Sequence, residues 1–106
     1  MRHPWATPVL RRVRRLAAER KVRFTLEAFQ ELARLDIGLD EEDACDVLEK
    51  LTPSDLVGRL ASEKNGEWMY VFNPSVAGIA LYVKVVLRSD CVVISFHEEE
   101  DSDEDQ

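Results

Sequence analysis

The feature that most constrains this fold is a pair of apolar runs near the end of the chain, "IALYVKVVLR" (79–88) and "CVVISFH" (91–97). Both runs are rich in β-branched and aromatic residues, which favour strands. Only Ser89 and Asp90 separate them, and so short a connection joins neighbouring antiparallel strands. The sequence therefore predicts a β-hairpin over residues 79–97.

The side-chain pattern indicates a register for this hairpin. A two-residue connection sets Tyr82 opposite His97 and Lys84 opposite Ser95, all on one face. A slip by one residue would bury Lys84 or His97, which is costly for polar groups without a partner. The opposite face is then wholly apolar and should lie under the helices: Val83, Val85, Leu87, Val92, Ile94 and Phe96.

Three stretches before the hairpin carry helical periodicity. Apolar residues recur at helical spacing over residues 9–17, and the arginines of "RRVRR" mostly fall off that stripe, which makes the helix basic. Thr25 is a good cap for a helix over residues 26–35, and Asp40 is one for the next helix. "VRF" (22–24) is a short extended link. The inward side chains expected on the second helix are Leu26, Phe29, Leu32 and Ala33, and on the third Ala44, Val47, Leu48 and Leu51.

Two further segments lie between the helices and the hairpin. Thr52 followed by Pro53 predicts a short helical turn that runs to about Leu60. "EWMYVF" (67–72) is aromatic and predicts a strand. Helices first and adjacent strands later indicate an α+β fold, with N-terminal helices packed on one face of a C-terminal antiparallel β-sheet.

The strand at 67–72 is expected to pair with residues 79–88. The loop between them, from Pro74 to Gly78, then sets Met69 beside Tyr82. In the same register Glu67 lies beside Lys84. This would bring a third strand to the polar face of the hairpin.

The net charge of −7 is concentrated at the end of the chain. Of the 21 acidic residues, seven lie in "EEEDSDEDQ" (98–106), which leaves 14 in residues 1–97 against 14 lysines and arginines. Residues 98–106 hold no apolar side chain and are predicted to be a disordered acidic tail, whereas residues 1–97 form a single domain. The low pI therefore does not exclude an RNA-binding surface on the domain.

Composition excludes several classes of protein. Two cysteines, Cys45 and Cys91, provide no disulfide framework, stand in apolar surroundings as inert core residues and suit a reducing cytoplasm. His3 and His97 are not spaced with them as zinc ligands, so no metal site is expected. The sequence has no apolar run long enough to span a membrane.

The polar face of the hairpin has the groups that RNA cleavage without a metal requires. The reaction needs a base for the 2′-hydroxyl, an acid for the leaving 5′-oxygen and cations for the phosphate charge. His97, Tyr82 and Lys84 are residues of these types, with Arg88 and Arg59 as phosphate contacts. The alternative is a solvated sheet face, on which Glu67 only neutralises Lys84.

The ordered series "LTPSDL", a tryptophan strand, "LYVK" and "VVISF" resembles the motility quorum-sensing regulator (MqsR) family of bacterial toxins over residues 9–97. The resemblance implies a RelE-like fold and a metal-independent mRNA interferase without cofactor. It also implies two partners, mRNA and a cognate antitoxin protein, and a location in the bacterial cytoplasm.

The resemblance also assigns residues. The family's catalytic tyrosine falls on Tyr82, its "LYVK" lysine on Lys84, and the lysine that closes "SFK" on His97. An imidazole is a reasonable exchange there, because histidine side chains transfer protons near neutral pH. The family's other lysine falls on Gly58 and its glutamine on Met69, and Arg59 is the adjacent substitute. RNA contacts are expected from Arg88, Lys64 and Ser95.

Three functions remain open from the sequence. The first is a toxin of a type II toxin–antitoxin system, an endoribonuclease that cleaves mRNA and inhibits growth through Tyr82, Lys84, His97 and Arg59. The second is a catalytically impaired RelE-like module that binds an antitoxin, another protein or RNA without cleavage, as Gly58 and Met69 suggest. The third, a DNA-bound regulator that acts through the "RRVRR" helix, lacks a helix-turn-helix signature.

Overall fold

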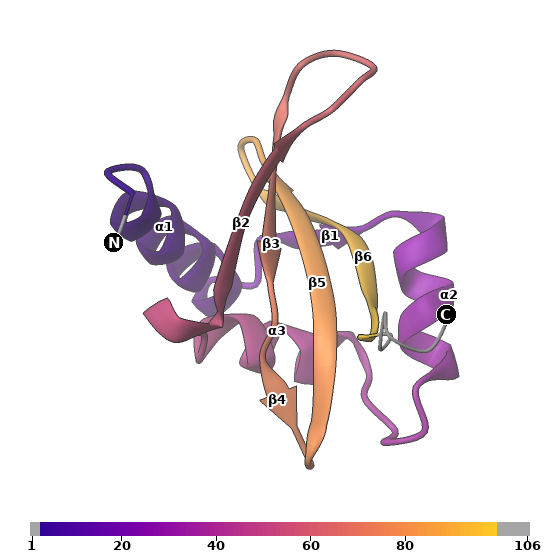
Figure 1. The fold of residues 1–106 in the computed structure, drawn as a ribbon. Helices are drawn as coiled ribbons and strands as arrows, with labels where there is room; N and C mark the ends of the chain where they lie inside the picture. The colour runs from indigo at the N-terminus through magenta and orange to yellow at the C-terminus, as the bar shows by residue number, and fades with distance from the viewer. Residues whose placement is uncertain (1–2, 100–106) are drawn as a thin grey trace, which may run out of the picture.

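The computed structural model describes residues 3–99, which form three helices, one 3₁₀ turn and a six-stranded mixed sheet (Figure 1). The predicted α+β fold, with helices first and strands later, is confirmed. None of the described helices is long and apolar enough to cross a membrane. The elements in chain order are α1 (Ala6–Ala18), β1 (Val22–Phe24), α2 (Leu26–Arg34), α3 (Glu41–Glu49), η1 (Pro53–Asp55), β2 (Leu56–Ala61), β3 (Trp68–Phe72), β4 (Ser75–Val76), β5 (Ile79–Leu87) and β6 (Cys91–Glu98).

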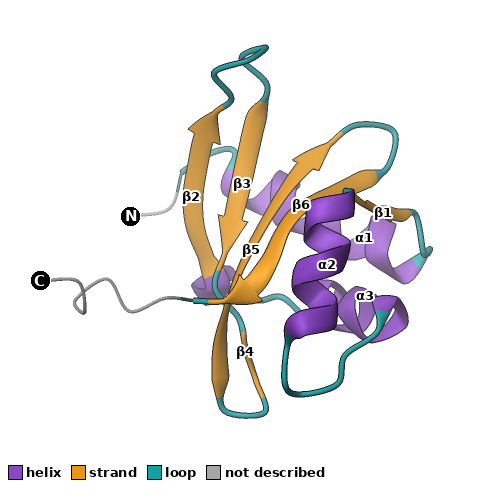
Figure 2. Cartoon of the chain, turned by 90° about the vertical axis from the view of Figure 1, so that its right-hand side faces the viewer, coloured by secondary structure: helices purple, strands orange, loops and turns teal. Residues whose placement is uncertain are grey.

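The sheet has the strand order β1-β6-β5-β3-β2, and β4 pairs with β5. β1 is the expected extended link, but it joins the sheet and runs parallel to β6, whereas the other pairs are antiparallel. Helices α1 and α3 pack on each other behind the sheet, and α2 stands at its β6 edge (Figures 1 and 2). The face of the sheet turned away from α1 and α3 is called the open face below.

The hydrophobic core fills the space between the sheet and the helices. Cys91 is fully buried and Cys45 is 6 % exposed, so both cysteines are core residues as predicted. Burial raises the pKa of the Cys91 thiol to about 12. Each large side chain buried here stabilises the domain by about 1.5–3 kcal/mol. The largest fully buried side chains are Phe72, Phe96, Leu48, Leu51, Leu81, Val13, Val83, Val85 and Val93.

Side-chain caps define the start of α2 and of α3, as predicted. The Thr25 side chain accepts a hydrogen bond from the Ala28 N–H at the start of α2. Asp40 and Asp43 form a reciprocal capping box at the start of α3. β6 continues through Glu98, one residue past the predicted end of the domain. Residues 100–106, most of the predicted acidic tail, lie outside the described residues.

The predicted helical turn from Pro53 to Leu60 is wrong after its first three residues. Only Pro53–Asp55 are helical, as η1, and Leu56–Ala61 form strand β2 instead. Val57 and Gly58 are poor helix formers, so the helix gains little by continuing. Pairing with β3 supplies backbone hydrogen bonds to this segment, and it becomes the edge strand of the sheet.

The predicted inward face of α2 is also wrong, except at Leu32. Leu26 is 72 % exposed and Phe29 47 % exposed, whereas Ala28 and Leu32 are buried. The helix lies along the edge of β6, where the Glu31 carboxylate accepts from the Phe96 N–H at 2.9 Å. A helix at the edge of a sheet buries only the side chains that face that edge. Leu26 and Phe29 point away from the edge and therefore remain exposed.

The hairpin of β5 and β6 has the predicted register only in the half away from the turn. Tyr82 pairs with His97 and Val83 with Phe96, but Val85 pairs with Val93, because Ile94 is an extra residue in a β-bulge. The bulge shifts the alternation of β6 by one position. Cys91 and Val93 point into the core before the bulge, and Phe96 does so after it, whereas Val92 and Ile94 were predicted there.

The predicted pairing of β3 with β5 is wrong by four positions. Met69 pairs with Val86, not with Tyr82, and Val71 pairs with Lys84. The chain reverses at Ala77 and Gly78, both with positive φ, in the two-residue turn between β4 and β5. This tight turn, rather than a longer loop from Pro74, sets the register.

Candidate functional site

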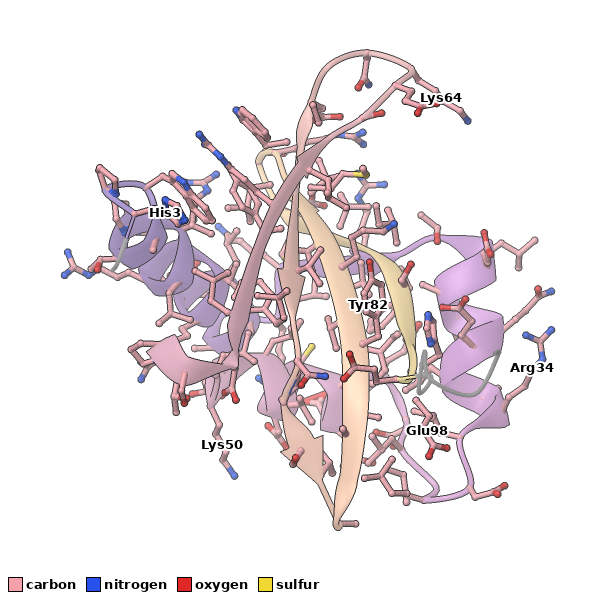
Figure 3. All side chains as sticks on the ribbon, viewed as in Figure 1. His3, Arg34, Lys50, Lys64, Tyr82 and Glu98 are labelled. Atoms are coloured by element: carbon pink, nitrogen blue, oxygen red, sulfur yellow. The ribbon has the colours of Figure 1, made fainter. Side chains whose placement is uncertain are left out.

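The four polar residues predicted on the hairpin lie together on the open face. β5 provides Tyr82 and Lys84, and β6 provides Ser95 and His97. The backbone pairs Tyr82 with His97 and Lys84 with Ser95, as predicted. All four side chains are half-buried, and Figure 3 shows Tyr82 on the open face beside β6. They are called the hairpin cluster below.

Ring stacking organises the hairpin cluster. The ring centroids of Tyr82 and His97 are 5.1 Å apart, with an angle of 21° between the ring planes. The ammonium nitrogen of Lys84 lies 5.9 Å from the centroid of the Tyr82 ring. An imidazole, a phenol and an ammonium group are thus neighbours on one exposed surface.

One hydrogen bond orients the imidazole of His97. Its Nδ1 lies 2.8 Å from the carbonyl oxygen of Glu98. A carbonyl oxygen only accepts, so Nδ1 carries the proton in this contact. The Nε2 atom of the neutral ring then has a free lone pair and is the atom able to accept a proton.

The end of β6 that carries His97 is held from three directions. On its outer edge the Phe96 N–H donates to Glu31, and the fully buried Phe96 ring anchors the strand in the core. On the β5 side, the Glu99 N–H donates to the Ala80 carbonyl oxygen at 2.8 Å. These contacts keep the His97 ring against Tyr82.

Apolar residues and a glycine surround the cluster on the open face. One row across β6, β5, β3 and β2 consists of Ser95, Lys84, Val71 and Gly58. The next row consists of Val92, Val86, Met69 and Leu60. Gly58 and Met69, the positions assigned by resemblance to a lysine and a glutamine, therefore do lie on the same face as Lys84.

Arg59 lies on the other face of the sheet. Successive residues of a strand point to opposite faces, and Arg59 pairs with Tyr70, which packs against the core. Its guanidinium carbon is 4.7 Å from the centroid of the Trp5 ring and 3.8 Å from that of Trp68. The structure therefore does not bring Arg59 to the hairpin cluster, despite its place in sequence beside Gly58.

Arg88 and Lys64, two of the three predicted RNA contacts, also lie apart from the cluster, whereas Ser95 belongs to it. Arg88 makes two hydrogen bonds to the Glu67 carboxylate, at 2.9 and 3.0 Å, which raise the pKa of Arg88 and lower that of Glu67. The expected contact of Glu67 with Lys84 is thus replaced by this pair. Lys64 is exposed in the loop between β2 and β3, at the end of the sheet away from Tyr82 (Figure 3).

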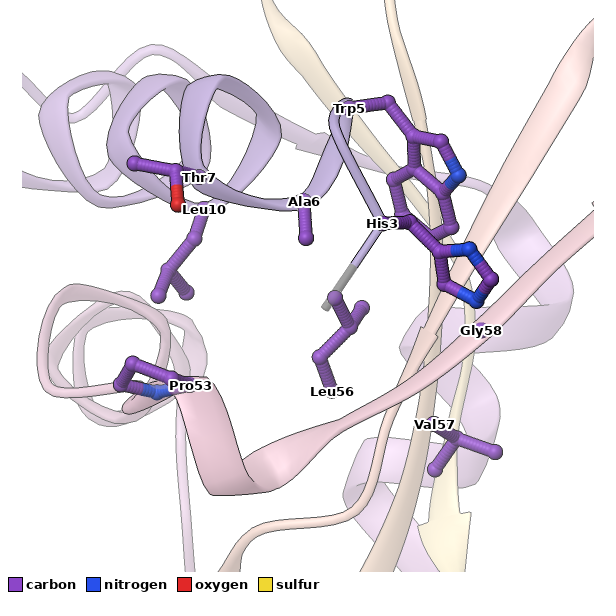
Figure 4. A pocket seen from close by; sticks show the side chains of 9 residues that line it. All are labelled: His3, Trp5, Ala6, Thr7, Leu10, Pro53, Leu56, Val57 and Gly58. Carbon is purple, nitrogen blue, oxygen red and sulfur yellow. The ribbon is translucent and has the colours of Figure 1, made fainter. Parts of the chain in front are cut away.

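A pocket of about 530 Å³ lies between the first turn of α1, η1 and β2 (Figure 4). The stacked rings of His3 and Trp5 stand on one side of it, with centroids 5.3 Å apart, and Gly58 lies on its β2 wall. The sequence pattern does not predict this pocket, because it predicts a helical turn where β2 forms the pocket wall. The pairing of β2 with β3 brings Arg59 next to Trp68, and this pairing cannot be read from the local sequence.

Fold and site define a small α+β protein that gathers tyrosine, lysine and histidine side chains on an open sheet face. The family model described as motility quorum-sensing regulator, toxin of MqsA, matches residues 6–98, from the start of α1 to the end of β6. The chain belongs to this family, as the resemblance predicts. It is therefore a toxin of a toxin–antitoxin system, and family membership implies an antitoxin partner. No curated protein matches the chain significantly.

Proposed function

We propose that this toxin is a metal-independent endoribonuclease that cleaves mRNA in the bacterial cytoplasm and thereby inhibits translation and growth. The observation that carries the proposal is the stack of Tyr82 on His97 with the Lys84 ammonium group beside it. These three groups provide proton transfer and charge stabilisation. Family resemblance assigns catalytic positions to Tyr82 and His97 and matches the lysine at Lys84.

In the proposed reaction, Nε2 of His97 takes the proton of a ribose 2′-hydroxyl. The 2′-oxygen forms a bond to the adjacent phosphorus, and the bond from phosphorus to the 5′-oxygen breaks. The Tyr82 hydroxyl donates a proton to the departing 5′-oxygen, while the Lys84 ammonium stabilises the charge on the phosphate. The products are a 2′,3′-cyclic phosphate and a 5′-hydroxyl, and solvent returns the His97 proton to Tyr82.

Two features support a role for the surroundings of these groups. Ser95 lies opposite Lys84, where its hydroxyl would donate to a phosphate oxygen held by the ammonium group. The His97 tautomer set by the Glu98 carbonyl leaves the basic nitrogen free for substrate. No step requires a metal ion or an organic cofactor.

A second function is favoured by one observation. The open face has no side chain at Gly58 and an apolar one at Met69, so two polar groups assigned by resemblance are missing beside Lys84. A chain with this face would bind its antitoxin, another protein or RNA without cleaving RNA. The two proposed functions are distinguished by one measurement, which is whether the purified chain forms cleaved RNA.

Incubation of the purified chain with a long mRNA, in the presence of a chelator and between about pH 6 and 8, tests the proposal. We expect cleavage that His97→Ala combined with Tyr82→Phe reduces by roughly 100-fold or more, since general acid–base groups contribute about 10²–10⁴-fold. Lys84→Ala should be slower than Lys50→Ala, which removes an exposed lysine elsewhere. Intact RNA at every pH would favour the binding function, and a fully active double variant would refute the site.

A further inference from the structure

We propose that this toxin has a second RNA-binding surface, on the side of the sheet opposite the hairpin cluster, which binds single-stranded RNA next to the cleavage site. This tryptophan surface consists of Trp5, Arg59 and Trp68 together with the exposed arginines of α1. The inference rests on the proposed function, because the RNA it would bind is the substrate of the hairpin cluster.

Stacked flat groups form the centre of the tryptophan surface. The Arg59 guanidinium lies over the Trp68 ring at 3.8 Å and over the Trp5 ring at 4.7 Å. Trp5 also stacks on His3, with 10° between the ring planes. Trp68 remains 42 % exposed. Bases of single-stranded RNA stack on aromatic rings and guanidinium groups, and each such stack contributes about 1–3 kcal/mol.

The pocket beside the stack is large enough for a base. Its volume of about 530 Å³ lies within the range of small-molecule sites, roughly 300–1,000 Å³. Figure 4 shows the His3 and Trp5 rings on one side and Leu56 and Pro53 on the other. Polar and apolar atoms line it about equally, and the polar groups include the Thr7 hydroxyl and the His3 ring. A pocket of this size, with ring faces and polar groups on its walls, suits a nucleobase.

Arginines on α1 supply charge for the phosphates. The inner side of the helix is buried in the core, and Arg11, Arg14 and Arg15 are exposed on its outer side. Among residues 3–99, the ion pairs of the structure involve other cations, such as Arg20, and none of these three. α1 begins directly after Trp5, so these arginines lie on the helix that follows the aromatic stack, about two to three turns along it.

Gly58 connects the tryptophan surface to the hairpin cluster. It lines the pocket and also lies in the row of Lys84 and Ser95 on the open face. β2 is the edge strand, and a Cβ added at Gly58 would meet no atom within 4 Å. A nucleic acid strand crossing the sheet edge at this glycine would pass from the pocket to Lys84, two strand spacings or about 10 Å away.

The charge of the arginines would also attract an acidic peptide, but the stacked rings favour RNA. Asp and Glu side chains have no aromatic ring to stack on Trp68, and the negative face of an indole repels a carboxylate. Single-stranded RNA has both phosphates and bases, and it therefore complements the arginines and the stack together.

Intrinsic fluorescence tests the inference, because Trp5 and Trp68 are the two tryptophans of the sequence and both belong to this surface. The full chain with His97→Ala and Tyr82→Phe, which should not cut RNA, is titrated with a short oligouridylate at low salt. We expect saturable quenching. Trp68→Leu should weaken binding about 5- to 150-fold, the equivalent of one stacked base, and Arg59→Gln is a second variant in case the first folds poorly by circular dichroism.

The electrostatic part has a matched control. R11E/R14E should weaken binding and lower the slope of log affinity against log salt by about 1.4, or 0.7 for each phosphate that the variant no longer neutralises. R34E/K50E reverses the same charge at two exposed positions away from the surface and should change neither quantity.

Several outcomes would overturn the inference. These are an absence of quenching, affinity unchanged in both stack variants, and equal binding of inorganic polyphosphate or polyglutamate, which have no bases. Cleavage of mRNA by the parent chain without quenching would refute the tryptophan surface alone. Quenching without cleavage would refute the proposed function and leave the surface in place.

Discussion

Replacing Gly58 by lysine should accelerate RNA cleavage, because it places a second cation beside Lys84 on the open face. The position accepts a side chain: a Cβ there meets nothing within 4 Å, and the backbone is outside the left-handed region. It is also the position on which the family's catalytic lysine falls by resemblance. The substitution therefore restores charge to the site without disturbing the fold.

The expected gain follows from the row geometry. Gly58 and Lys84 are separated by Val71 alone, so their Cα atoms are about 10 Å apart and both ammonium groups reach a phosphate between them. A cation about 4 Å from a phosphate charge contributes about 4 kcal/mol at an effective dielectric constant near 20. Solvent exposure and salt reduce this to about 0.5–1 kcal/mol, the range of exposed ion pairs. At 1.36 kcal/mol for each factor of ten, cleavage should be about 2- to 5-fold faster.

The assay is kcat/KM on one end-labelled RNA, for the parent, Gly58→Lys and Ala33→Lys. Ala33 is exposed on α2, so its replacement adds the same charge away from the site. The gain should shrink as salt rises and should vanish when His97→Ala is added. Equal rates for Gly58→Lys and Ala33→Lys, in a folded protein, would refute the reasoning that links the row to catalysis.

Three further predictions concern the scaffold. Deleting Ile94 removes the bulge but leaves Val93 opposite Val85 and Ser95 opposite Lys84, so Phe96 stays in the core and we expect a loss in urea unfolding no larger than that of Ile94→Ala; a loss of about 3 kcal/mol or more, as expected if Phe96 left the core, would contradict the description of Ile94 as the one extra residue. Because Arg88 holds the pKa of Glu67 below its usual 4.5, their pair stabilises the fold above that pH, and this contribution disappears as the pH falls through the lowered pKa. Arg88→Gln should therefore lower the urea midpoint near neutral pH and flatten its decline in acid, and an unchanged pH profile would contradict this. Both cysteines should resist a thiol reagent in the native state, because burial raises their pKa values, and should react once urea unfolds the chain; rapid labelling of Cys91 would argue against its burial.

The hairpin cluster could be predicted from the sequence because the alternation around it is strict. In "LYVK" and "SFH" polar and apolar residues alternate, so only one pairing keeps Lys84 and His97 out of the core. "CVVI" has four consecutive apolar residues and fits either face. The sequence therefore does not predict the bulge at Ile94, although the bulge determines which valine of β6 points into the core.

The tryptophan surface could not be predicted from the sequence, because it depends on contacts between residues distant in the chain. Thr52 and Pro53 start a helical turn, and nothing local shows that β3 will capture the residues after Asp55 as a strand. Without that strand, Arg59 cannot be assigned a face, and its contact with Trp5 and Trp68 cannot be foreseen.

The sequence by itself determined the α+β class, the helix caps, the toxin family and the neighbours Tyr82, Lys84, Ser95 and His97. These follow from local patterns, since alternation and capping act over a few residues. The tertiary structure alone decided that α2 lies on a sheet edge, that β2 is a strand, and that Gly58 and Arg59 point to opposite sides of it. The physical reason is that a strand or edge helix is stabilised by its partner, and the partner is distant in the chain.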